Sequence, residues 1–421
     1  MNVQRITQKA RIRKTVAAPG DKSISHRAVM IGALADGVTE IEGFLPGEDC
    51  LSTIACFKKL GVDITAENSR VLIKGNGLWG LAPPGADILD VGNSGTTLRL
   101  ITGILAGQRF NSSLTGDASI QKRPMKRVFE PLRAMGARFS ERDTAPFTVY
   151  GRRLKGVSYT LPVASAQVKS AIILASLFAE GETVVTEPQR TRDHTEIMLN
   201  YFGADVKRQG DRIISQPAQR LNACNLKTPG DISSAAFLIA LGLIAPDSEI
   251  TVTGVGVNPT RTGLLDTLID MGGDIEVENE RYYGGEPVAD ITARTSALKG
   301  VEISGAIIPR MIDEIPILAA AAAFAEGRTV IKDAEELKYK ESNRIKSVAS
   351  ELSKLGVHIT ETQDGLVVEG GHPLSGAIVD SHNDHRLAMS LAVVASVIEG
   401  DTFIKNSECV NVSFPGFFEL F

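Results

Sequence analysis

The sequence predicts an α/β protein of two domains, each built from three copies of one supersecondary unit. Six short apolar segments, each ending at Gly or Pro, recur at intervals of roughly 70 residues. Amphipathic segments alternate with them, and a two-residue alternation of apolar and polar positions follows each amphipathic segment. The chain has 421 residues, which is long for a single core, so two or three domains are expected.

The six apolar segments are apolar on nearly every side, which is typical of buried helices rather than surface helices. They begin at residues 28, 98, 171, 235, 316 and 387 and read AVMIGALA, LRLITGILA, AIILASLFA, AAFLIALGLIA, PILAAAAAFA and LAMSLAVVASVI. Each is followed by a β-rich stretch. We therefore expect one buried helix and one strand per unit.

The second family of helices has a polar face and ends in a Gly-containing signal. Its endings are KKLGVDI (58–64), RAMGARF (133–139), NYFGADV (200–206), IDMGGDI (269–275) and SKLGVHI (354–360). A hairpin pattern follows each ending, as in HITETQDGLVVEG (358–370). The predicted unit is buried helix, strand, amphipathic helix and hairpin.

The two ends of the chain are expected to complete one unit together. The sixth unit has no hairpin before residue 421, whereas residues 3–17 are strand-like and follow no helix. The chain must then cross twice between domains, at APGDK (18–22) and TPGDI (228–232). Pro fixes the approach, Gly permits a sharp reorientation, and Asp and Ser can cap the following helix. The predicted domains are 21–229 and 1–20 with 230–421, joined by a two-strand hinge.

Composition excludes several classes of function. The formal charge is −5 and aromatic residues make up 5%, which gives no basic footprint or stacking surface for nucleic acid. No apolar run reaches the roughly 18 residues of a membrane span, and the N-terminus lacks a signal peptide, so we expect a soluble cytoplasmic protein. The four cysteines lack metal-ligand spacing and are expected to be reduced thiols.

Polar clusters precede the buried helices, where free backbone N–H groups and the positive end of the helix dipole favour an anion. In DKSISHR (21–27), Lys22 and Arg27 place two cations at this end of a helix, which an anionic ligand would compensate. In GDISS (230–234) the polar residues are expected to act only as caps. If these helix starts face one cleft, the cleft would bind a substrate that carries several negative charges.

Further basic residues stand just before or within the amphipathic helices, namely Arg123, Arg192, Lys340 and Arg344. Each alone could be a solvated surface residue, but together they suit a substrate with a phosphate and a carboxylate. Neither a P-loop nor a GxGxxG motif after a strand is present, which argues against nucleotide use.

Two carboxylates in basic surroundings are candidate catalytic groups. Asp313, in IDEIP, could be a catalytic base or a helix cap, and Glu341, between Lys340 and Arg344, could be a catalytic acid or half of a structural ion pair. Sequence alone leaves both pairs of alternatives open.

The ordered set of motifs closely resembles the 5-enolpyruvylshikimate-3-phosphate synthases over essentially the whole chain. The motifs are PGDKSISHR, GNSGTTLR, KRPM, SAQVKSA, TRDH, PGDISSAAF, IDEIP, KESNRI and NDHR. The resemblance implies two inside-out α/β barrels, each of three βαβαββ repeats. It implies transfer of the enolpyruvyl group of phosphoenolpyruvate to the 5-hydroxyl of shikimate 3-phosphate, in aromatic amino-acid and chorismate biosynthesis. It also implies a cytoplasmic monomer that needs no metal or organic cofactor and is a target of glyphosate.

The resemblance also assigns roles to individual residues. Asp313 would be the general base for the 5-hydroxyl, Glu341 the acid that protonates the methylene carbon, and Lys22 a catalytic contact to both substrates. The shikimate 3-phosphate contacts would be Lys22, Ser23, Arg27, Ser165, Ala166, Gln167 and Arg192, and the phosphoenolpyruvate contacts Gly95, Arg123, Lys340, Arg344 and Arg386.

Departures from the motifs point to the second class within the family, which is often less sensitive to glyphosate. Ala166 stands where some members have Ser, and Val412 where some have Lys. Gly95 is retained where tolerant members have Ala, and Leu100 stands where sensitive members often have Pro. Glyphosate sensitivity therefore does not follow from the sequence.

Three alternative functions compete with this one. The sister enzyme that acts on UDP-N-acetylglucosamine carries a Cys where Ala118 stands in GDASIQKRP (116–124). A nucleic-acid enzyme of the RNA 3′-phosphate cyclase kind would need a nucleotide site and a catalytic His. A non-catalytic anion-binding protein would not require Asp313 or Glu341.

Overall fold

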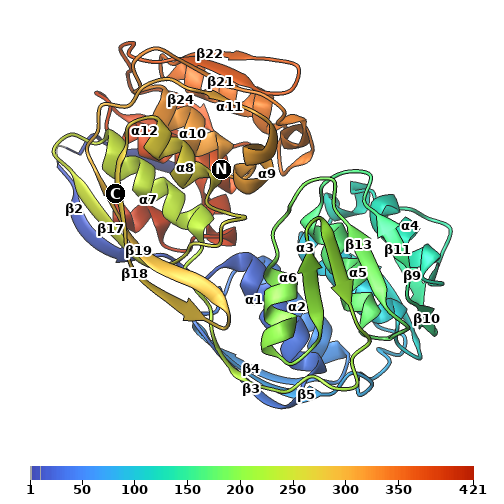
Figure 1. Cartoon of the computed structure of the whole chain (residues 1–421). Coiled ribbons are helices and arrows are strands. Elements are labelled where there is room, and N and C mark those ends of the chain that lie inside the picture. Colours follow the sequence, from blue (N-terminus) through green and yellow to red (C-terminus); the bar gives the residue numbers. More distant parts are fainter. Residues whose placement is uncertain (1, 10) are drawn as a thin grey trace. The chain divides into compact units, whose positions relative to one another are not determined.

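The computed structural model describes residues 2–9 and 11–421 (Figure 1). Its contacts divide the chain into two compact units. Unit 1 comprises the described residues of Met1–Pro19 with Pro229–Arg281 and Pro287–Phe421, and unit 2 comprises Gly20–Thr228 with Tyr282–Glu286. Residues 1 and 10 of the predicted segment 1–20 lie outside the described residues. We treat each unit by itself.

Unit 2 repeats the predicted order of buried helix, strand, amphipathic helix and hairpin three times. Its elements are α1 (Lys22–Leu34), β3 (Asp36–Glu42), α2 (Glu48–Lys59), β4 (Asp63–Glu67), β5 (Arg70–Asn76), β6 (Ile88–Asp90), α3 (Gly95–Ala106), β7 (Asn111–Thr115), η1 (Ile120–Lys122), α4 (Lys126–Ala134), β8 (Arg138–Phe139), β9 (Phe147–Tyr150), β10 (Leu154–Lys155), β11 (Ser158–Thr160), α5 (Ala166–Ser176), β12 (Ala179–Glu180), β13 (Thr183–Thr186), α6 (His194–Tyr201), β14 (Val206–Gln209), β15 (Arg212–Ser215) and β16 (Asn225–Lys227).

Each repeat of unit 2 forms a four-stranded sheet with one parallel and two antiparallel pairings. The strand orders are β16-β3-β5-β4, β6-β7-β9-β8 and β11-β13-β15-β14. Strand β5 shows the two-residue period, because Val71 and Ile73 are buried and alternate with exposed residues. In the first sheet the parallel edge strand is β16, from the far end of the unit, which pairs with β3 and joins the last repeat to the first.

The apolar helices of unit 2 are buried, as predicted. Helices α1, α3 and α5 have almost all of their residues buried and belong to one hydrophobic cluster with the inner faces of the sheets. The amphipathic helices bury one side only; in α2, for example, Ile54 and Phe57 are buried while Lys58 and Lys59 are exposed. The starts of α1, α3 and α5 carry most of the residues of this unit that are predicted to bind substrate.

Unit 1 has the same plan, drawn from both ends of the chain. Its elements are β1 (Val3–Ile6), β2 (Arg13–Ala17), α7 (Ile232–Ile244), β17 (Glu249–Gly256), α8 (Gly263–Asp270), β18 (Asp274–Tyr283), β19 (Glu286–Arg294), β20 (Glu302–Ile303), η2 (Gly305–Ile307), α9 (Ile308–Met311), α10 (Ile315–Ala322), β21 (Arg328–Ile331), η3 (Glu335–Tyr339), α11 (Arg344–Lys354), β22 (His358–Glu361), β23 (Leu366–Glu369), β24 (Ile378–Asp380), α12 (His385–Ala395), β25 (Thr402–Lys405), η4 (Ser407–Val412) and η5 (Phe417–Leu420).

The two N-terminal strands pair with strands of different repeats in unit 1, β1 with the sixth repeat and β2 with the fourth. Strand β1 pairs antiparallel with β25, from Val3 opposite Lys405 to Ile6 opposite Thr402, and supplies the sixth repeat with a strand in place of its missing hairpin. Strand β2 pairs parallel with β17. The three sheets have the orders β18-β19-β17-β2, β20-β21-β23-β22 and β1-β25-β24.

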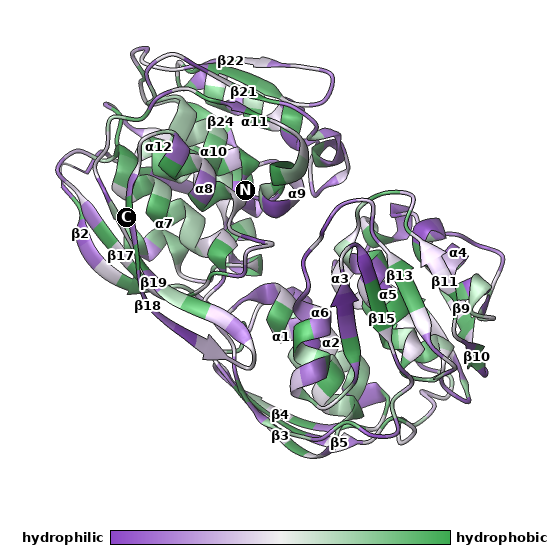
Figure 2. Ribbon diagram, viewed as in Figure 1, coloured by the Kyte–Doolittle hydropathy of each residue, from purple (hydrophilic) through white to green (hydrophobic). Residues whose placement is uncertain are grey.

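Helices α7, α10 and α12 lie side by side in the core of unit 1 (Figure 1). They are predominantly hydrophobic along their length (Figure 2), and nearly all of their residues are buried. The C-terminal segment adds Phe417, which is fully buried and packs edge-on against Phe237 of α7. No helix in residues 2–9 and 11–421 is long and apolar enough to cross a membrane.

The chain passes from one unit to the other at the two Pro-Gly-Asp stretches, between Pro19 and Gly20 and between Thr228 and Pro229. Gly20 has no positive φ; it is required because a Cβ there would lie 1.8 Å from the carbonyl oxygen of Gly43. The expectation that Gly20 permits a sharp reorientation of the chain was thus wrong; a glycine is needed there because the backbone at Gly43 approaches it closely. One further segment departs from the predicted boundary, since Tyr282–Glu286, at the tip of the β18–β19 hairpin, groups with unit 2.

Candidate active site

Lys22 is the first residue of α1, and Asp21 fixes this helix start. The Asp21 side chain accepts a hydrogen bond from the backbone N–H of Ile24 at 2.9 Å, which is a regular N-cap. The Lys22 Nζ atom lies 3.2 Å from Asp49 Oδ2 in α2, a partner that the sequence did not reveal. The lysine side chain is 19% exposed, so its ammonium group is held by α2 and remains accessible to a ligand.

Arg27 lies one turn further along α1 and is almost completely buried. Its guanidinium donates to Thr195 Oγ1 at 2.7 Å, to Ser170 Oγ at 2.9 Å and to the carbonyl oxygen of Ser23 at 2.9 Å. Burial lowers the pKa of Arg27 to about 10, although Glu196 opposes this effect. All three hydrogen-bond partners are uncharged, so an anionic ligand would stabilise this buried cation.

Gly95 is the first residue of α3, directly after the N-cap Ser94. A Cβ at Gly95 would lie 2.9 Å from Nη1 of Arg123, whose Nη2 donates to Asn93 Oδ1 at 2.9 Å. The missing side chain therefore leaves room beside a guanidinium at a helix N-terminus. This combination suits a phosphate or carboxylate.

The start of α5 continues the same cluster. Ser165 caps the helix and accepts the backbone N–H three residues on at 3.4 Å, and Ala166 is the first helical residue. Gln167 accepts a hydrogen bond from Arg99 at 2.5 Å and donates one to Thr96 Oγ1 at 3.1 Å. Its amide therefore ties the start of α5 to the first two turns of α3.

Arg192 precedes α6, and a buried ion cluster holds the segment in which it lies. Lys169 in α5 is fully buried; its Nζ lies 3.1 Å from Glu187 Oε1 and 2.8 Å from Glu196 Oε1. The same Nζ donates to the carbonyl oxygen of Thr191 at 3.3 Å, one residue before Arg192. Sequence reasoning missed Lys169; the available signal was a lysine at the start of the apolar run AIILA.

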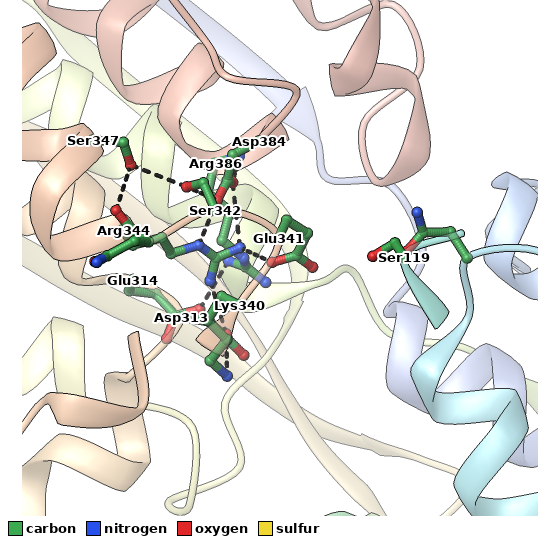
Figure 3. Close-up of polar contacts among 12 residues, drawn as sticks. Ser119, Asp313, Glu314, Lys340, Glu341, Ser342, Arg344, Ser347, Asp384 and Arg386 are labelled. Carbon is green, nitrogen blue, oxygen red and sulfur yellow. Dashed lines mark hydrogen bonds and ion pairs between the residues drawn. The ribbon is translucent and has the colours of Figure 1, made fainter. Parts of the chain in front are cut away.

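In unit 1, the Arg344 guanidinium is the centre of a cluster of three carboxylates (Figure 3). It lies 2.6 Å from Glu341 Oε2, 3.2 Å from Asp313 Oδ1 and 2.8 Å from Asp384 Oδ2. Burial would lower the pKa of Arg344, but the three carboxylates outweigh burial and raise it. Arg344 therefore stays charged and fixes the positions of Asp313 and Glu341.

Asp313 does not cap the following helix, so the capping interpretation is wrong. The N-cap residue of α10 is Glu314, and it makes no side-chain capping hydrogen bond. Instead, Asp313 Oδ1 lies 3.2 Å from Lys340 Nζ as well as 3.2 Å from Arg344 Nη1. Glu341 does form the ion pair with Arg344 that one interpretation predicted, and its side chain is 33% exposed and thus accessible to a substrate.

Helix α12 contributes Asp384 and Arg386. Asp384 is its N-cap and accepts the backbone N–H of Arg386 at 3.0 Å. Burial opposes ionisation of Asp384, but the charge of Arg344 prevails and lowers its pKa. The cap was predictable from NDHR, whereas the contact between Asp384 and Arg344 was not. Arg386 is 8% exposed, and its Nη1 lies 3.4 Å from Glu314 Oε1.

The predicted site residues thus gather in two sets, one in each unit. Both sets combine starts of buried helices with segments that precede amphipathic helices, where backbone N–H groups and basic side chains attract anions. Unit 2 holds Lys22, Ser23, Arg27, Gly95, Arg123, Ser165, Ala166, Gln167 and Arg192, and unit 1 holds Asp313, Lys340, Glu341, Arg344 and Arg386. The set in unit 1 alone adds carboxylates able to move protons.

A possible metal-binding group lies away from these sets, on the β22–β23 hairpin and the loop that follows it. Ligand atoms of His358, Glu369 and His372 lie within 4.8 Å of one another. The two imidazole rings are stacked, with centroids 3.7 Å apart and planes inclined by 19°. Lone pairs of imidazole nitrogens lie in the ring plane, so the nitrogens of stacked rings do not converge on one ion. We assign no metal to this group.

Comparison with known proteins identifies similar enzymes along the full chain. The family model for EPSP synthase (3-phosphoshikimate 1-carboxyvinyltransferase) matches residues 6–421. The 3-phosphoshikimate 1-carboxyvinyltransferase of Thermoanaerobacter sp. (strain X514) is 55% identical over 418 residues, covering 99% of this chain and 98% of the relative. That of Geobacillus kaustophilus is 56% identical over 417 residues, covering 98% and 97%. A solved structure of EPSP synthase from Acinetobacter baumannii superposes with a TM-score of 0.90 at 46% identity, covering 99% and 97% of the two chains.

Proposed function

The chain belongs to the EPSP synthase family, and from that premise we propose which of its residues carry out the family's reaction and how. The enzyme is a 3-phosphoshikimate 1-carboxyvinyltransferase. It transfers the enolpyruvyl group of phosphoenolpyruvate to the 5-hydroxyl of shikimate 3-phosphate and releases phosphate, in the shikimate pathway of aromatic amino-acid biosynthesis.

The set in unit 2 is proposed to bind shikimate 3-phosphate through Lys22, Ser23, Arg27, Ser165, Ala166, Gln167 and Arg192. Arg27 supports this assignment, because it is a buried cation whose direct partners are all uncharged. A phosphate would add charge-assisted hydrogen bonds to those that these neutral partners accept. Gly95 and Arg123 of the same unit, with Lys340, Arg344 and Arg386, are proposed to bind phosphoenolpyruvate.

The arrangement around Asp313 is the single observation that carries the mechanism. Asp313 Oδ1 lies 3.2 Å from both Lys340 Nζ and Arg344 Nη1, and the two cations favour its ionised form, which a base requires. Asp313 would remove the proton of the 5-hydroxyl while the oxygen attacks C2 of phosphoenolpyruvate. Glu341, protonated before the addition step, would donate this proton to C3, which gives a tetrahedral adduct.

The adduct would collapse by loss of phosphate from C2 and transfer of a proton from the C3 methyl group back to the Glu341 carboxylate, which restores the double bond. Lys22, Lys340 and Arg344 would stabilise the negative charges of the adduct and of the leaving phosphate. The reaction joins the two substrates, so the proposal requires both sets to serve one reaction. The enzyme is further proposed to act as a monomer in the cytoplasm.

We further propose that the two units are the inside-out barrels of this family and that the two crossings are hinge strands. Three mutually packed helices inside three sheets support the barrel assignment for unit 1. In unit 2 the buried α1, α3 and α5 support it in the same way.

One assay tests the proposed function against the sister activity. Purified enzyme is incubated with phosphoenolpyruvate and either shikimate 3-phosphate or UDP-N-acetylglucosamine, and released phosphate is measured. Turnover is expected only with shikimate 3-phosphate, since the sister enzyme needs a Cys where Ala118 stands. Asp313→Asn serves as the control for contaminating phosphatase. Turnover with UDP-N-acetylglucosamine alone would refute the proposal.

A further inference from the structure

Glu314 is a buried carboxylate next to Asp313 to which none of the roles above is assigned. Its side chain is completely buried. Its Oε1 atom accepts a hydrogen bond from Ser233 Oγ and lies 3.4 Å from Arg386 Nη1, while its Oε2 atom has no hydrogen-bond partner among the described residues. A buried carboxylate with an unsatisfied oxygen is costly, so its presence calls for a compensating role.

A series of hydrogen bonds fixes Glu314 on the side away from Arg386. Ser233 accepts a hydrogen bond from Arg261 Nη2 at 2.7 Å, and the same Nη2 lies 3.0 Å from Asp231 Oδ1. Asp231 belongs to the second Pro-Gly-Asp stretch and also caps α7 through the backbone N–H of Ser233 at 2.9 Å. All four of these side chains are buried. The polar residues of this stretch therefore cap α7, as predicted, and in addition orient Glu314.

These hydrogen-bonded side chains reach the proposed substrate site through the contact between Glu314 and Arg386. Among the described residues, Glu314 is the only side chain with which the Arg386 guanidinium forms a hydrogen bond or an ion pair. A guanidinium has five N–H donors in a rigid fork, so a single contact at Nη1 fixes its position and leaves most of its donors for a ligand. Figure 3 shows Glu314 and Arg386 beside the cluster of Asp313, Lys340 and Arg344.

We propose that Glu314 is a positioning residue that holds the Arg386 guanidinium in place for the anionic groups of phosphoenolpyruvate, and that Ser233 and Arg261 keep Glu314 in that orientation. The inference rests on the proposed function, in which Arg386 binds phosphoenolpyruvate. It goes beyond that function, because it links the proposed phosphoenolpyruvate site to the second Pro-Gly-Asp stretch, where the chain enters unit 1. Glu314 does not touch the substrate and takes no part in proton transfer.

The test compares KM for each substrate with kcat in Glu314→Ala, Arg386→Ala and the double variant. A lost hydrogen bond to a charged group predicts that KM for phosphoenolpyruvate rises about tenfold in Glu314→Ala, while kcat and KM for shikimate 3-phosphate stay within about threefold. Arg386→Ala should raise the same KM at least as much. The double variant should match Arg386→Ala, because Glu314 acts only through Arg386.

If Glu314 had a merely structural role, Glu314→Ala would instead change all kinetic parameters together, or its effect on KM for phosphoenolpyruvate would multiply with that of Arg386→Ala in the double variant. Either result overturns the inference. Ser396→Ala is the matched control, since Ser396 is a buried serine at the end of α12 whose hydroxyl donates to the backbone carbonyl of Val393. It should leave KM for phosphoenolpyruvate unchanged.

Glu314→Gln keeps the inference testable if Glu314→Ala does not fold. The amide oxygen can accept the same two hydrogen bonds without the charge, so a rise of about threefold in KM for phosphoenolpyruvate is expected, and a wild-type KM would overturn the inference. If Arg386→Ala raises this KM and the Glu314 variants do not, the inference alone fails. If Arg386→Ala has no effect, the assignment of Arg386 in the proposed function fails as well.

Discussion

His26 makes the stability of unit 2 sensitive to mild acid. It lies on α1 between the site residues Lys22 and Arg27, but it is completely buried. Its Nδ1 atom is 2.7 Å from Thr53 Oγ1, and its Nε2 atom has no hydrogen-bond partner among the described residues. Burial lowers its pKa to about 3, and the charges of Lys22 and Arg27 act in the same direction against Asp49. His26 is therefore a neutral structural residue and not a catalytic base.

The size of the effect follows from the two pKa values. In the unfolded chain the pKa of histidine is 6.5, against about 3 in the folded protein. Below pH 6.5, His26 binds a proton in the unfolded state but not in the folded state. The contribution of neutral His26 to the unfolding free energy is therefore fully present above pH 6.5 and is lost as the pH decreases towards 3. Between pH 7.5 and 5.0 the loss from this one residue is about 2 kcal/mol.

Urea denaturation at these two pH values measures the effect. Trp79, the only tryptophan, lies in unit 2 and packs against Phe178, so its fluorescence reports on that unit. In His26→Asn, the difference in unfolding free energy between pH 7.5 and 5.0 should be about 2 kcal/mol smaller than in the wild type. Ser25→Ala, also buried in α1, should lower stability at both pH values and keep the wild-type difference. An unchanged difference in His26→Asn would refute the reasoning.

Three further predictions concern the substrate sites. Arg27→Ala removes a buried cation whose hydrogen-bond partners are uncharged and should raise KM for shikimate 3-phosphate about tenfold or more. Initial rates are measured against both substrates, and an unchanged KM for shikimate 3-phosphate would contradict the assignment. Asp313→Ala should lower kcat by about 10²- to 10⁴-fold with little change in the affinity for shikimate 3-phosphate, and equal losses in both would identify Asp313 as structural. Gly95→Ala would place a Cβ 2.9 Å from the flexible end of Arg123, so KM for phosphoenolpyruvate should rise about three- to tenfold at an unchanged melting temperature; a lowered melting temperature would show that the fold, and not the guanidinium, had to adjust.

The repeat and most of the site were predictable because they depend on local signals. Helix caps such as Asp21 and Asp231 act within three residues, and the periodicity of apolar residues fixes which helices are buried. The pairing of β1 with β25 was predictable as well, since a unit without its hairpin needs a strand from elsewhere. For the candidate site, the local signals were cations at helix starts and carboxylates among basic residues.

The contacts that the sequence did not reveal join segments that are distant along the chain. Asp49 meets Lys22 across 27 positions, and Asp384 meets Arg344 across 40. From the sequence, an acidic residue at a helix start is interpreted as a cap. The structure shows that Asp384 has a second partner, the Arg344 guanidinium. The role of Asp313 could not be decided for the same reason, because capping and ion pairing require the same residue type at the same position.

The strand exchange between the ends of the sequence has a consequence for the order in which the protein folds as it is synthesised. The main segment of unit 2 ends at Thr228, and its edge strand β16 closes the first sheet, so this unit can assemble early. In unit 1, strand β2 must wait for β17 and strand β1 for β25, almost the whole length of the chain later. We therefore expect chains stalled on the ribosome after the main segment of unit 2 is complete and before β17 has emerged to contain a protease-resistant unit 2 behind a cleavable N-terminal segment; protection of both regions at that stage would contradict this order. Strands β1 and β2 are thus synthesised long before the strands with which they pair.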